Sequence, residues 1–283
     1  MLSTKITMII HAGLGNQLFM IFTGLSKAID ENREFSVYPI FNNQHRGYYF
    51  TTIFRKLLFK VEDRQENIQE RPCYEEREHH YFPIPREAYV LKGYFQSYKY
   101  FNHNKYRIIK YLDFEPYYNK YQMNNDSIAI HFRFGDNTIN QIDHHQLRPN
   151  YYINAISRLN DLSPNVTDVY DFIIFSEKCD DDLVNEYIEV INNELEKKIN
   201  KRINFIKIYD LYKDTKDYQE LFYMANCKHL IIANSSFSWF SAFLCENQEK
   251  IIIYPDEWFG PRIKNQKSLK DMFPDNWIKV KAL

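Results

Sequence analysis

Two stretches of the sequence carry residues that suit the binding of an anion. In the first, HLIIANSSF, the apolar run His229 to Ala233 is followed at once by Asn234, Ser235 and Ser236. Short apolar runs of this kind are typical of buried parallel strands, and Asn and Ser are preferred where a helix begins. A helix that starts directly after a strand presents unpaired backbone N–H groups, which commonly bind phosphate. An ordinary capped helix would leave the same pattern.

The second stretch, IAIHFRFGD, places His131, Arg133 and Asp136 at the end of a strand predicted for SIAIHF. Ligands of open parallel sheets bind beyond the carboxyl ends of the strands. Arg133 would offer paired N–H donors to a phosphate already held by the helix start at Ser235. A surface salt bridge is the alternative for one arginine, but the combination of both stretches favours a phosphate site.

A glycine-containing turn follows a predicted first strand, ITMII. It places Gly13, Gly15, Asn16 and Gln17 at the start of a predicted amphipathic helix. The dinucleotide-binding fingerprint fails, because Leu18 occupies the position of its third glycine. The glycines still allow a ligand to approach the backbone closely, and the two amide side chains would lie beside it. A tight turn with two polar residues is the plainer alternative.

The sequence offers little for a metal. Asp180, Asp181 and Asp182 match a DxD pattern, but acidic residues at the start of a long predicted helix are mostly explained by capping and by the helix dipole. The four cysteines are scattered, without a CxxC pair. We therefore predict no metal site, no disulfide framework and a reducing compartment.

Composition narrows the functional classes. The chain has 283 residues and a net charge of −1, so no overall basic field indicates nucleic-acid binding. We expect no signal peptide and no membrane-spanning run, and hence a cytoplasmic protein. The high aromatic content of 17% suits a sugar ligand, although a compositional bias would produce it as well.

Strands and helices alternate regularly from Asp126 onward, which predicts an open parallel sheet covered by helices on both faces. The N-terminal part has its own strand–turn–helix start. We predict an acceptor-side α/β domain over residues 1–120 and a nucleotide-binding Rossmann-like domain over 121–283. A last helix is expected to pack back on the first domain.

Residues 41–125 are less regular. TIFRKLLFKV is predicted as a helix and AYVLKGYF as a strand. In an extended chain, Lys92, Tyr94, Gln96 and Tyr98 would share one face. Such a face could hold a sugar, but internal packing is the favoured interpretation.

Five segments, taken together, resemble the α-1,2-fucosyltransferase family: GLGNQLF, GYFQSYKYF, HFRFGD, YQELFYMANCKHLIIANSSFSWFSAFL and IIIYPDEWF. The resemblance implies a GT-B type fold, with two Rossmann-like domains facing across a cleft. It also implies GDP-β-L-fucose as donor substrate, with no cofactor and no metal. Fucose would pass with inversion to a hydroxyl of an acceptor glycan, the 2-OH of a galactoside.

The resemblance also implies roles for individual residues. Arg133 would hold the β-phosphate with the support of His131 and Asp136, and Asn16 would lie near the reacting sugar. Asp136 and His131 are both candidates for a general base, which stays unassigned. Glu177 would contact guanine or ribose. The implied donor-binding set is Gly13, Gly15, Asn16, Gln17, His131, Arg133, Glu177, Asn234, Ser235, Ser236 and Phe237.

One position departs from the family pattern, in which HxRRxD is usual. Phe134 replaces the second basic residue, which removes a charge near the diphosphate. This keeps open a weakly active module of the same fold that binds a GDP-sugar or a glycan. A metal-dependent transferase that uses Asp180 or Asp182 and another nucleotide sugar is the other alternative.

Overall fold

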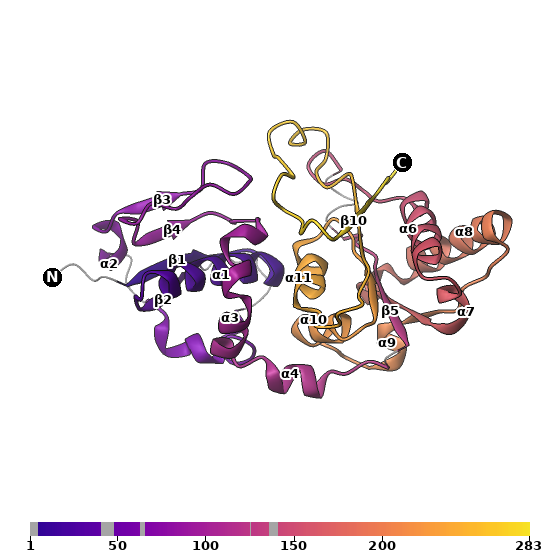
Figure 1. Cartoon of the computed structure of the whole chain (residues 1–283), viewed down its shortest axis with the longest axis horizontal. Helices are drawn as coiled ribbons and strands as arrows, with labels where there is room; N and C mark the ends of the chain where they lie inside the picture. The colour runs from indigo at the N-terminus through magenta and orange to yellow at the C-terminus, as the bar shows by residue number, and fades with distance from the viewer. Residues whose placement is uncertain (1–4, 41–47, 63–65, 125, 136–140) are drawn as a thin grey trace. The chain divides into compact units, whose positions relative to one another are not determined.

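Two parallel sheets, one in each part of the chain, organise the structure (Figure 1). The computed structural model describes residues 5–40, 48–62, 66–124, 126–135 and 141–283. The chain divides into an N-terminal unit, Met1–Tyr117 with Ser268–Pro274, and a C-terminal unit, Tyr118–Lys267 with Asp275–Leu283. Each unit is an α/β structure built on its own sheet, which confirms the predicted class of two Rossmann-like domains.

In its described residues, the N-terminal unit has a four-stranded sheet of order β2-β1-β4-β3, with all neighbouring strands parallel. Helix α1 packs on β1, and Gly24 permits the close approach, because a Cβ there would lie 2.5 Å from the Phe35 ring. The elements are β1 (Ile6–Ile10), α1 (Leu14–Asp30), β2 (Phe35–Pro39), η1 (Arg55–Lys60), α2 (Glu66–Gln69), β3 (Cys73–Glu75), β4 (Val90–Lys92), η2 (Tyr98–Tyr100), η3 (Asn102–Asn104), α3 (Lys105–Leu112) and α4 (Glu115–Lys120), which spans the division between the units.

The described part of the C-terminal unit has a six-stranded parallel sheet of order β10-β9-β8-β5-β6-β7. Figure 1 shows α10 and α11 on one side of this sheet and α6 and α8 on the other. The elements are β5 (Ser127–His131), α6 (Pro149–Leu162), α7 (Val166–Val169), β6 (Asp171–Phe175), η4 (Lys178–Asp180), α8 (Asp181–Ile199), β7 (Phe205–Lys207), α9 (Ile208–Leu211), α10 (Asp217–Ala225), β8 (His229–Ile231), α11 (Ser236–Leu244), β9 (Ile252–Pro255) and β10 (Ile278–Val280).

The strand order of the C-terminal sheet is that of the Rossmann fold. The first strand of the unit, β5, lies in the middle. The next two strands follow on one side of it, and β8, β9 and β10 follow on the other. The point where the order reverses, between β5 and β8, is where such sheets bind their ligands. The fold therefore directs attention to the loops after β5 and β8.

Successive side chains of β5 and of the residues just after it alternate between the two faces of the sheet. Ile128, Ile130, Phe132 and Phe134 belong to the hydrophobic cluster that includes residues of α6 and α8. Because successive side chains of an extended chain point to opposite faces, the residues between them face the α10–α11 side.

Two predicted elements differ in the structure. TIFRKLLFKV contains a short 3₁₀ helix, η1, rather than a longer α-helix. The predicted last helix is wrong. The segment that returns to the N-terminal unit, Ser268–Pro274, forms turns, and the chain ends with strand β10. Asp271 has a left-handed backbone (φ 61°) and Pro274 lacks an N–H donor, and both features oppose a helix there.

No helix in the described ranges is long and apolar enough to cross a membrane.

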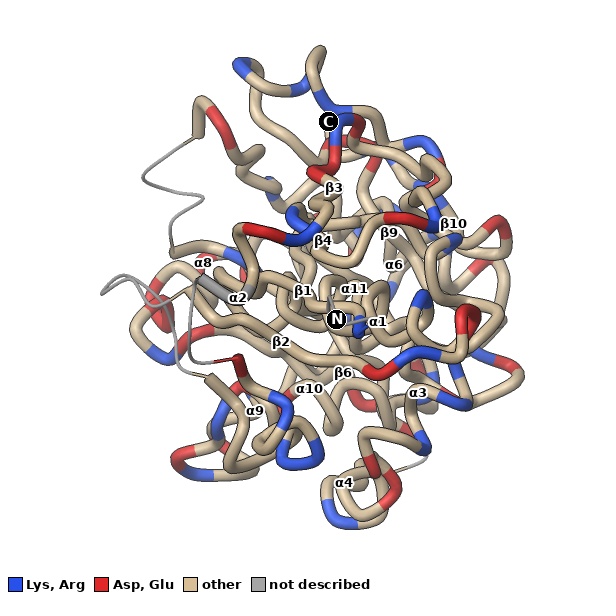
Figure 2. The backbone as a smooth tube through the Cα atoms, turned by 90° about the vertical axis from the view of Figure 1, so that its left-hand side faces the viewer, with Lys and Arg blue, Asp and Glu red and all other residues tan. Residues whose placement is uncertain are grey.

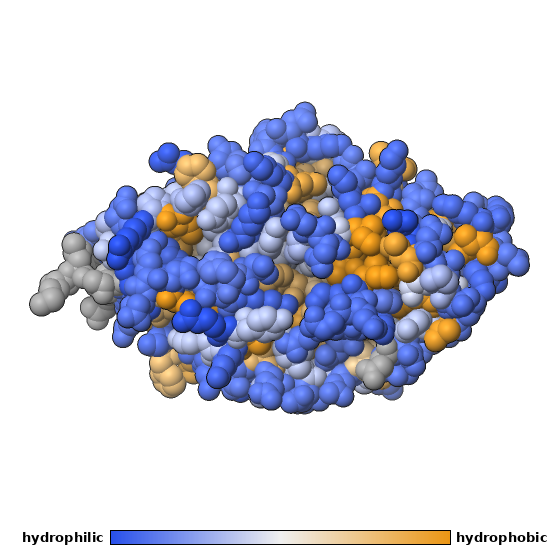
Figure 3. All heavy atoms as spheres, in the orientation of Figure 1, coloured by the Kyte–Doolittle hydropathy of each residue, from blue (hydrophilic) through white to orange (hydrophobic). Residues whose placement is uncertain are grey.

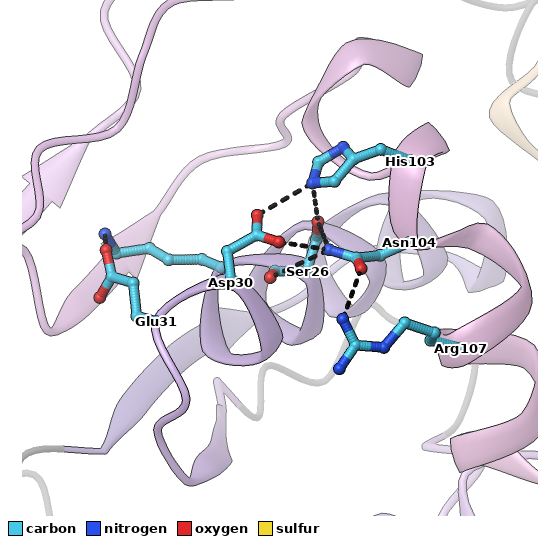
Figure 4. Close-up of polar contacts among 7 residues, drawn as sticks. Ser26, Asp30, Glu31, His103, Asn104 and Arg107 are labelled. Atoms are coloured by element: carbon cyan, nitrogen blue, oxygen red, sulfur yellow. Dashed lines mark hydrogen bonds and ion pairs between the residues drawn. The ribbon is translucent and has the colours of Figure 1, made fainter.

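A polar network fixes α3 to α1 in the N-terminal unit (Figure 4). The buried Asn104 amide donates to Ser26 Oγ at 3.0 Å and to Asp30 Oδ1 at 2.7 Å, and its oxygen accepts from Arg107 at 3.2 Å. His103 Nε2 lies 2.9 Å from Asp30 Oδ2. The network holds the start of α3 against the helix that carries the glycine turn.

We expect Asn104→Ala to lower the free energy of unfolding by about 1–3 kcal/mol, because buried polar partners lose their hydrogen bonds. Urea unfolding would measure the change. The neighbouring, exposed Asn102→Ala is the control and should change stability by about 0.5 kcal/mol or less. Equal losses in both variants would contradict a specific role for the network.

Candidate functional site

The carboxyl ends of β5 and β8 lie side by side, since Ile130 pairs with Ile231 in a parallel register. The loop after β5 carries Arg133, and the loop after β8 leads into α11 at Ser235. The two sequence stretches that favour an anion site therefore meet at the reversal point of the sheet.

Arg133 is held in place by neighbours on both sides. Its Nη1 donates to Glu177 Oε1 at 3.1 Å, and Glu177 follows β6, the strand on the other side of β5. Gly135 has a left-handed backbone (φ 45°), and a Cβ there would lie 3.1 Å from Arg133 Nη1. The glycine thus leaves room for the guanidinium to rest against the loop. The Arg133 side chain is 19% exposed, so it stays accessible to a ligand.

The start of α11 lies on the same side of the sheet as Arg133. Ser235 is the N-cap, and its hydroxyl accepts from the Phe237 N–H at 3.3 Å. The Phe237 ring lies 5.7 Å from the His131 ring, measured between centroids. Arg133 is two residues beyond His131 and shares its face in the alternating pattern. The guanidinium and the helix start are therefore arranged around one region at the carboxyl edge.

His131 is a neutral group at ordinary pH. Its side chain is buried, and the loss of hydration, together with the nearby Arg133 charge, lowers its pKa from 6.5 to about 3. The Tyr152 hydroxyl donates to the His131 carbonyl at 3.1 Å and so fixes the end of the strand. At neutral pH, His131 therefore adds no positive charge for an anion and is a weak proton acceptor.

Asn234 uses its amide N–H groups within the protein. They donate to the carbonyl oxygens of His145 at 2.7 Å and of Trp258 at 3.0 Å. The residue thus ties two loops to the start of α11. Its direct role in donor binding stays a prediction.

The acidic candidates divide into different environments. Asp136 lies outside the described residues. Burial and the neighbouring Glu177 raise the pKa of Asp180, which accepts a hydrogen bond from the Gly135 backbone. Asp181 accepts from Lys207 and from the Tyr209 hydroxyl. Within the described ranges, no group of three or more His, Cys, Asp or Glu side chains is arranged to hold a metal ion.

Phe134, which stands where the HxRRxD pattern has its second basic residue, is buried in the hydrophobic core. Its ring packs edge-on against Tyr187, with the centroids 5.0 Å apart. Arg133, by contrast, points to the opposite face of the chain, toward the Glu177 carboxylate. The side chain at position 134 therefore serves packing between β5 and α8.

The glycine turn of the N-terminal unit differs in detail from its prediction. The left-handed residue is Ala12 (φ 64°), Gly13 is the N-cap of α1, and Gly15 lies in the first helical turn. A Cβ at Gly13 would meet nothing within 4 Å, so this backbone is open to a ligand. The buried Gln17 amide donates to the Ala12 carbonyl at 2.8 Å and stabilises the turn.

Asn16 is oriented by a residue from another strand end. The Gln96 amide donates to Asn16 Oδ1 at 2.8 Å, and Tyr94 lies beside His11 with ring centroids 4.9 Å apart. These residues follow β4 and β1, which are neighbours in the sheet. The structure therefore brings Asn16 and Gln96 together, a contact that the sequence pattern did not predict.

The predicted extended face after β4 is wrong. β4 ends at Lys92, and both Gly93 (φ 146°) and Phe95 (φ 52°) have left-handed backbones. The Glu76 carboxylate accepts from the Tyr94 and Phe95 N–H groups at 2.7 and 2.9 Å, which stabilises this turn. Two positive φ angles break the alternation that the prediction assumed.

Sequence reasoning did not identify Gly135 or Tyr152 as parts of the site. The glycine two residues after Arg133 was a usable signal, because glycine is common where the backbone turns left-handed. No local pattern marked Tyr152, because its hydrogen bond to the His131 carbonyl joins two elements, α6 and β5, that are separate in the chain.

The low pKa of His131 predicts a specific pH dependence of stability. The unfolded chain takes up a proton at this residue below about pH 6.5, whereas the folded chain does so only near pH 3, so acid favours unfolding in that window. Between pH 8 and about pH 5, the unfolding free energy of the wild type should fall by about 2 kcal/mol more than that of the His131→Gln variant. Urea unfolding of both proteins at the two pH values measures the difference. Equal losses of unfolding free energy in the two proteins would refute the prediction that the His131 imidazole is buried and neutral.

The Arg133–Glu177 pair predicts competition between the carboxylate and an anionic ligand. Glu177→Gln should bind inorganic pyrophosphate roughly two- to fivefold more tightly, because a partly exposed ion pair opposes binding by about 1 kcal/mol or less. GDP should bind less tightly if Glu177 also contacts the nucleoside. Calorimetry with both ligands separates the effects, with Glu196→Gln, which removes the ion pair to Arg202, as control. Unchanged pyrophosphate affinity would show that Glu177 does not compete.

Comparison with known proteins points to glycosyltransferases. The chain is 30% identical to an alpha-1,2-colitosyltransferase of Escherichia coli over 158 residues, which is 55% of this chain and 48% of that protein. It is 36% identical to the Escherichia coli O-antigen biosynthesis glycosyltransferase WbnK over 61 residues, which is 22% of this chain and 18% of that protein. The matched regions thus span less than half the length of these relatives.

Two solved structures are similar at low identity. The glycosyl transferase family 9 protein of Veillonella parvula aligns with a TM-score of 0.42 and 11% identity, covering 100% of this chain and 88% of that one. A mutant of Arabidopsis thaliana FUT1 in complex with GDP aligns with a TM-score of 0.45 and 12% identity, covering 89% and 70%. No protein-family model matches the chain. In sequence it is similar to proteins that are named as an alpha-1,2-colitosyltransferase and as an O-antigen biosynthesis glycosyltransferase.

Proposed function

We propose that the chain is a glycosyltransferase that moves L-fucose from GDP-β-L-fucose to a hydroxyl of an acceptor glycan, the 2-OH of a galactoside. The observation that supports the proposal is that Arg133 and the α11 start follow adjacent strands, β5 and β8, at the reversal point of a Rossmann-order sheet. The sequence similarity to an alpha-1,2-colitosyltransferase supports both the reaction class and the linkage.

The proposed chemistry depends on charge at the leaving group. Breaking the bond between sugar and phosphate leaves negative charge on GDP, and fixed donors must stabilise that charge. The Arg133 guanidinium supplies a forked pair of N–H donors, and α11 adds the unpaired N–H groups of its first turn. This arrangement needs neither a metal nor a cofactor, and such independence is part of the proposal.

The acceptor hydroxyl must lose a proton as the new bond forms. His131 suits this role poorly, because a general base works best with a pKa near the operating pH and that of His131 is about 3. We leave the base unassigned.

GDP-colitose is a second candidate donor, because a relative at 30% identity carries alpha-1,2-colitosyltransferase as its name. Colitose differs from fucose by the absence of the 3-hydroxyl. A site that hydrogen-bonds this hydroxyl discriminates strongly against the sugar that lacks it, whereas an apolar site discriminates weakly. Competing GDP-fucose against GDP-colitose in one assay identifies the donor.

Arg133→Ala should lower the rate of transfer by at least about 10²–10³-fold, as expected for the loss of a donor that stabilises developing negative charge. The folded state should survive, since the Arg133–Glu177 ion pair is partly exposed. GDP release from GDP-fucose and GDP-colitose, with galactoside acceptors, would measure the effect.

Arg202→Ala is the matched control, because it removes an arginine from an exposed ion pair elsewhere in the same unit. Near-wild-type transfer by Arg133→Ala would refute the site. Loss of turnover in the presence of EDTA would favour the metal-dependent alternative. Binding of GDP-sugar without any GDP release would instead indicate the weakly active binding module.

A further inference from the structure

The most exposed large apolar side chain among the described residues is Phe59, at 94%. It lies on η1 beside Leu58, which is 45% exposed. Figure 3 shows apolar surface over this segment, which is the dark purple stretch below β2 in Figure 1. A single exposed apolar residue is ordinary, but exposed apolar residues that form a patch mark candidate interaction surfaces, and Leu58 and Phe59 are adjacent.

The exposure of Phe59 follows from how η1 is anchored. Phe54 and Leu57 are fully buried, and after the segment Val61 forms a parallel bridge with Val37 of β2. Both ends of the turn are therefore fixed to the unit. A short 3₁₀ helix held in this way must direct Leu58 and Phe59 outward.

The surroundings of Phe59 are basic. η1 has the sequence RKLLFK and packs against α3, KYRIIKYL, and these elements carry six Lys or Arg residues and no carboxylate. Figure 2 marks the basic residues of α3 in blue. Helix α3 also exposes Tyr106 (67%) and Tyr111 (41%). We call the exposed residues of these two elements the η1–α3 surface.

Only part of this positive charge is balanced locally. Asp113 pairs with Arg55 at 2.5 Å and with Lys56 at 3.6 Å. Lys60 and Lys110 form no ion pair with any residue that the structure describes. The surface thus keeps a positive charge although the whole chain has a net charge of −1.

We propose that the η1–α3 surface docks on an anionic lipid membrane, with Phe59 inserted at the interface between headgroups and acyl chains. Apolar and aromatic side chains flanked by lysines are the usual means of peripheral binding to such membranes. Each basic residue near an anionic leaflet adds to the attraction. The proposal concerns where the protein binds, and it does not depend on the identity of the donor sugar.

Co-sedimentation with vesicles tests the proposal. The protein should bind vesicles of phosphatidylcholine with phosphatidylglycerol at about 0.1 M salt, and much less at about 1 M salt or with phosphatidylcholine alone. Phe59→Ala should weaken binding about tenfold, as expected for the loss of one buried aromatic side chain. Lys56→Glu combined with Lys60→Glu should weaken it further.

Matched variants control for general surface effects. Phe82→Ala removes another exposed phenylalanine of the same unit, at 51% exposure. Lys279→Glu with Lys281→Glu makes the same charge change at exposed lysines of the C-terminal unit. Both controls should bind vesicles like the wild type, and all variants should keep the wild-type thermal midpoint. No binding to anionic vesicles, or equal weakening by the controls, would overturn the proposal.

Phe59→Trp gives a direct readout of insertion. The native tryptophans Trp239, Trp258 and Trp277 are buried, so the added fluorescence belongs to position 59. Its emission should shift to the blue on anionic vesicles, and binding should be at least as tight as in the wild type, because tryptophan favours membrane interfaces. Binding without a shift would mean that residue 59 stays in water, which would also overturn the proposal.

Discussion

The pairing of β5 with both β6 and β8 is the constraint on which the candidate site depends. A central strand with parallel neighbours on each side brings three carboxyl ends to one edge of the sheet. Arg133, Glu177 and the start of α11 come from these three ends. Neighbouring strands lie only about 4.8 Å apart, so residues distant in sequence become close in space. Local sequence alone could not create this arrangement.

Few of the polar residues at the candidate site contribute a charge to it. Burial keeps His131 uncharged, and Phe134 belongs to the core. The side-chain N–H groups of Asn234 donate to two backbone carbonyls. Among the described residues, the positive potential at the edge therefore comes from Arg133 and from the dipole of α11, and the carboxylates of Glu177 and Asp180 oppose it. A guanidinium in contact with a carboxylate responds to the charge of a ligand that competes for it.

The fold of the C-terminal unit could be predicted because its elements show clear patterns. Continuous apolar runs marked β5, β6 and β8, and α8 showed its amphipathic period and its acidic start. The region around β3 and β4 could not be predicted in the same way. Its strands are three residues each, and its shape depends on Glu76 binding backbone N–H groups from a turn 18 residues later in the chain. Such contacts produce no periodic pattern of residues in the sequence.

The positions of the candidate residues at strand ends could be predicted from the sequence, whereas the surroundings of their side chains could not. Position in a parallel sheet follows from patterns of buried residues, so Arg133 and Ser235 could be placed at one edge. The protonation of His131 and the partners of Asn234 depend on packing from α6, α11 and distant loops. These are tertiary properties, and the types of the neighbouring residues do not reveal them.

Asn234 also has a mechanical consequence. One side chain joins the backbone just before α6, at His145, to the backbone just after β9, at Trp258, and it stands directly before the N-cap of α11. If the start of this helix were displaced, both loops would have to move with it in order to keep their hydrogen bonds to Asn234. The two hydrogen bonds thus couple three segments that are remote in the chain, so that each restrains the position of the others at the start of α11.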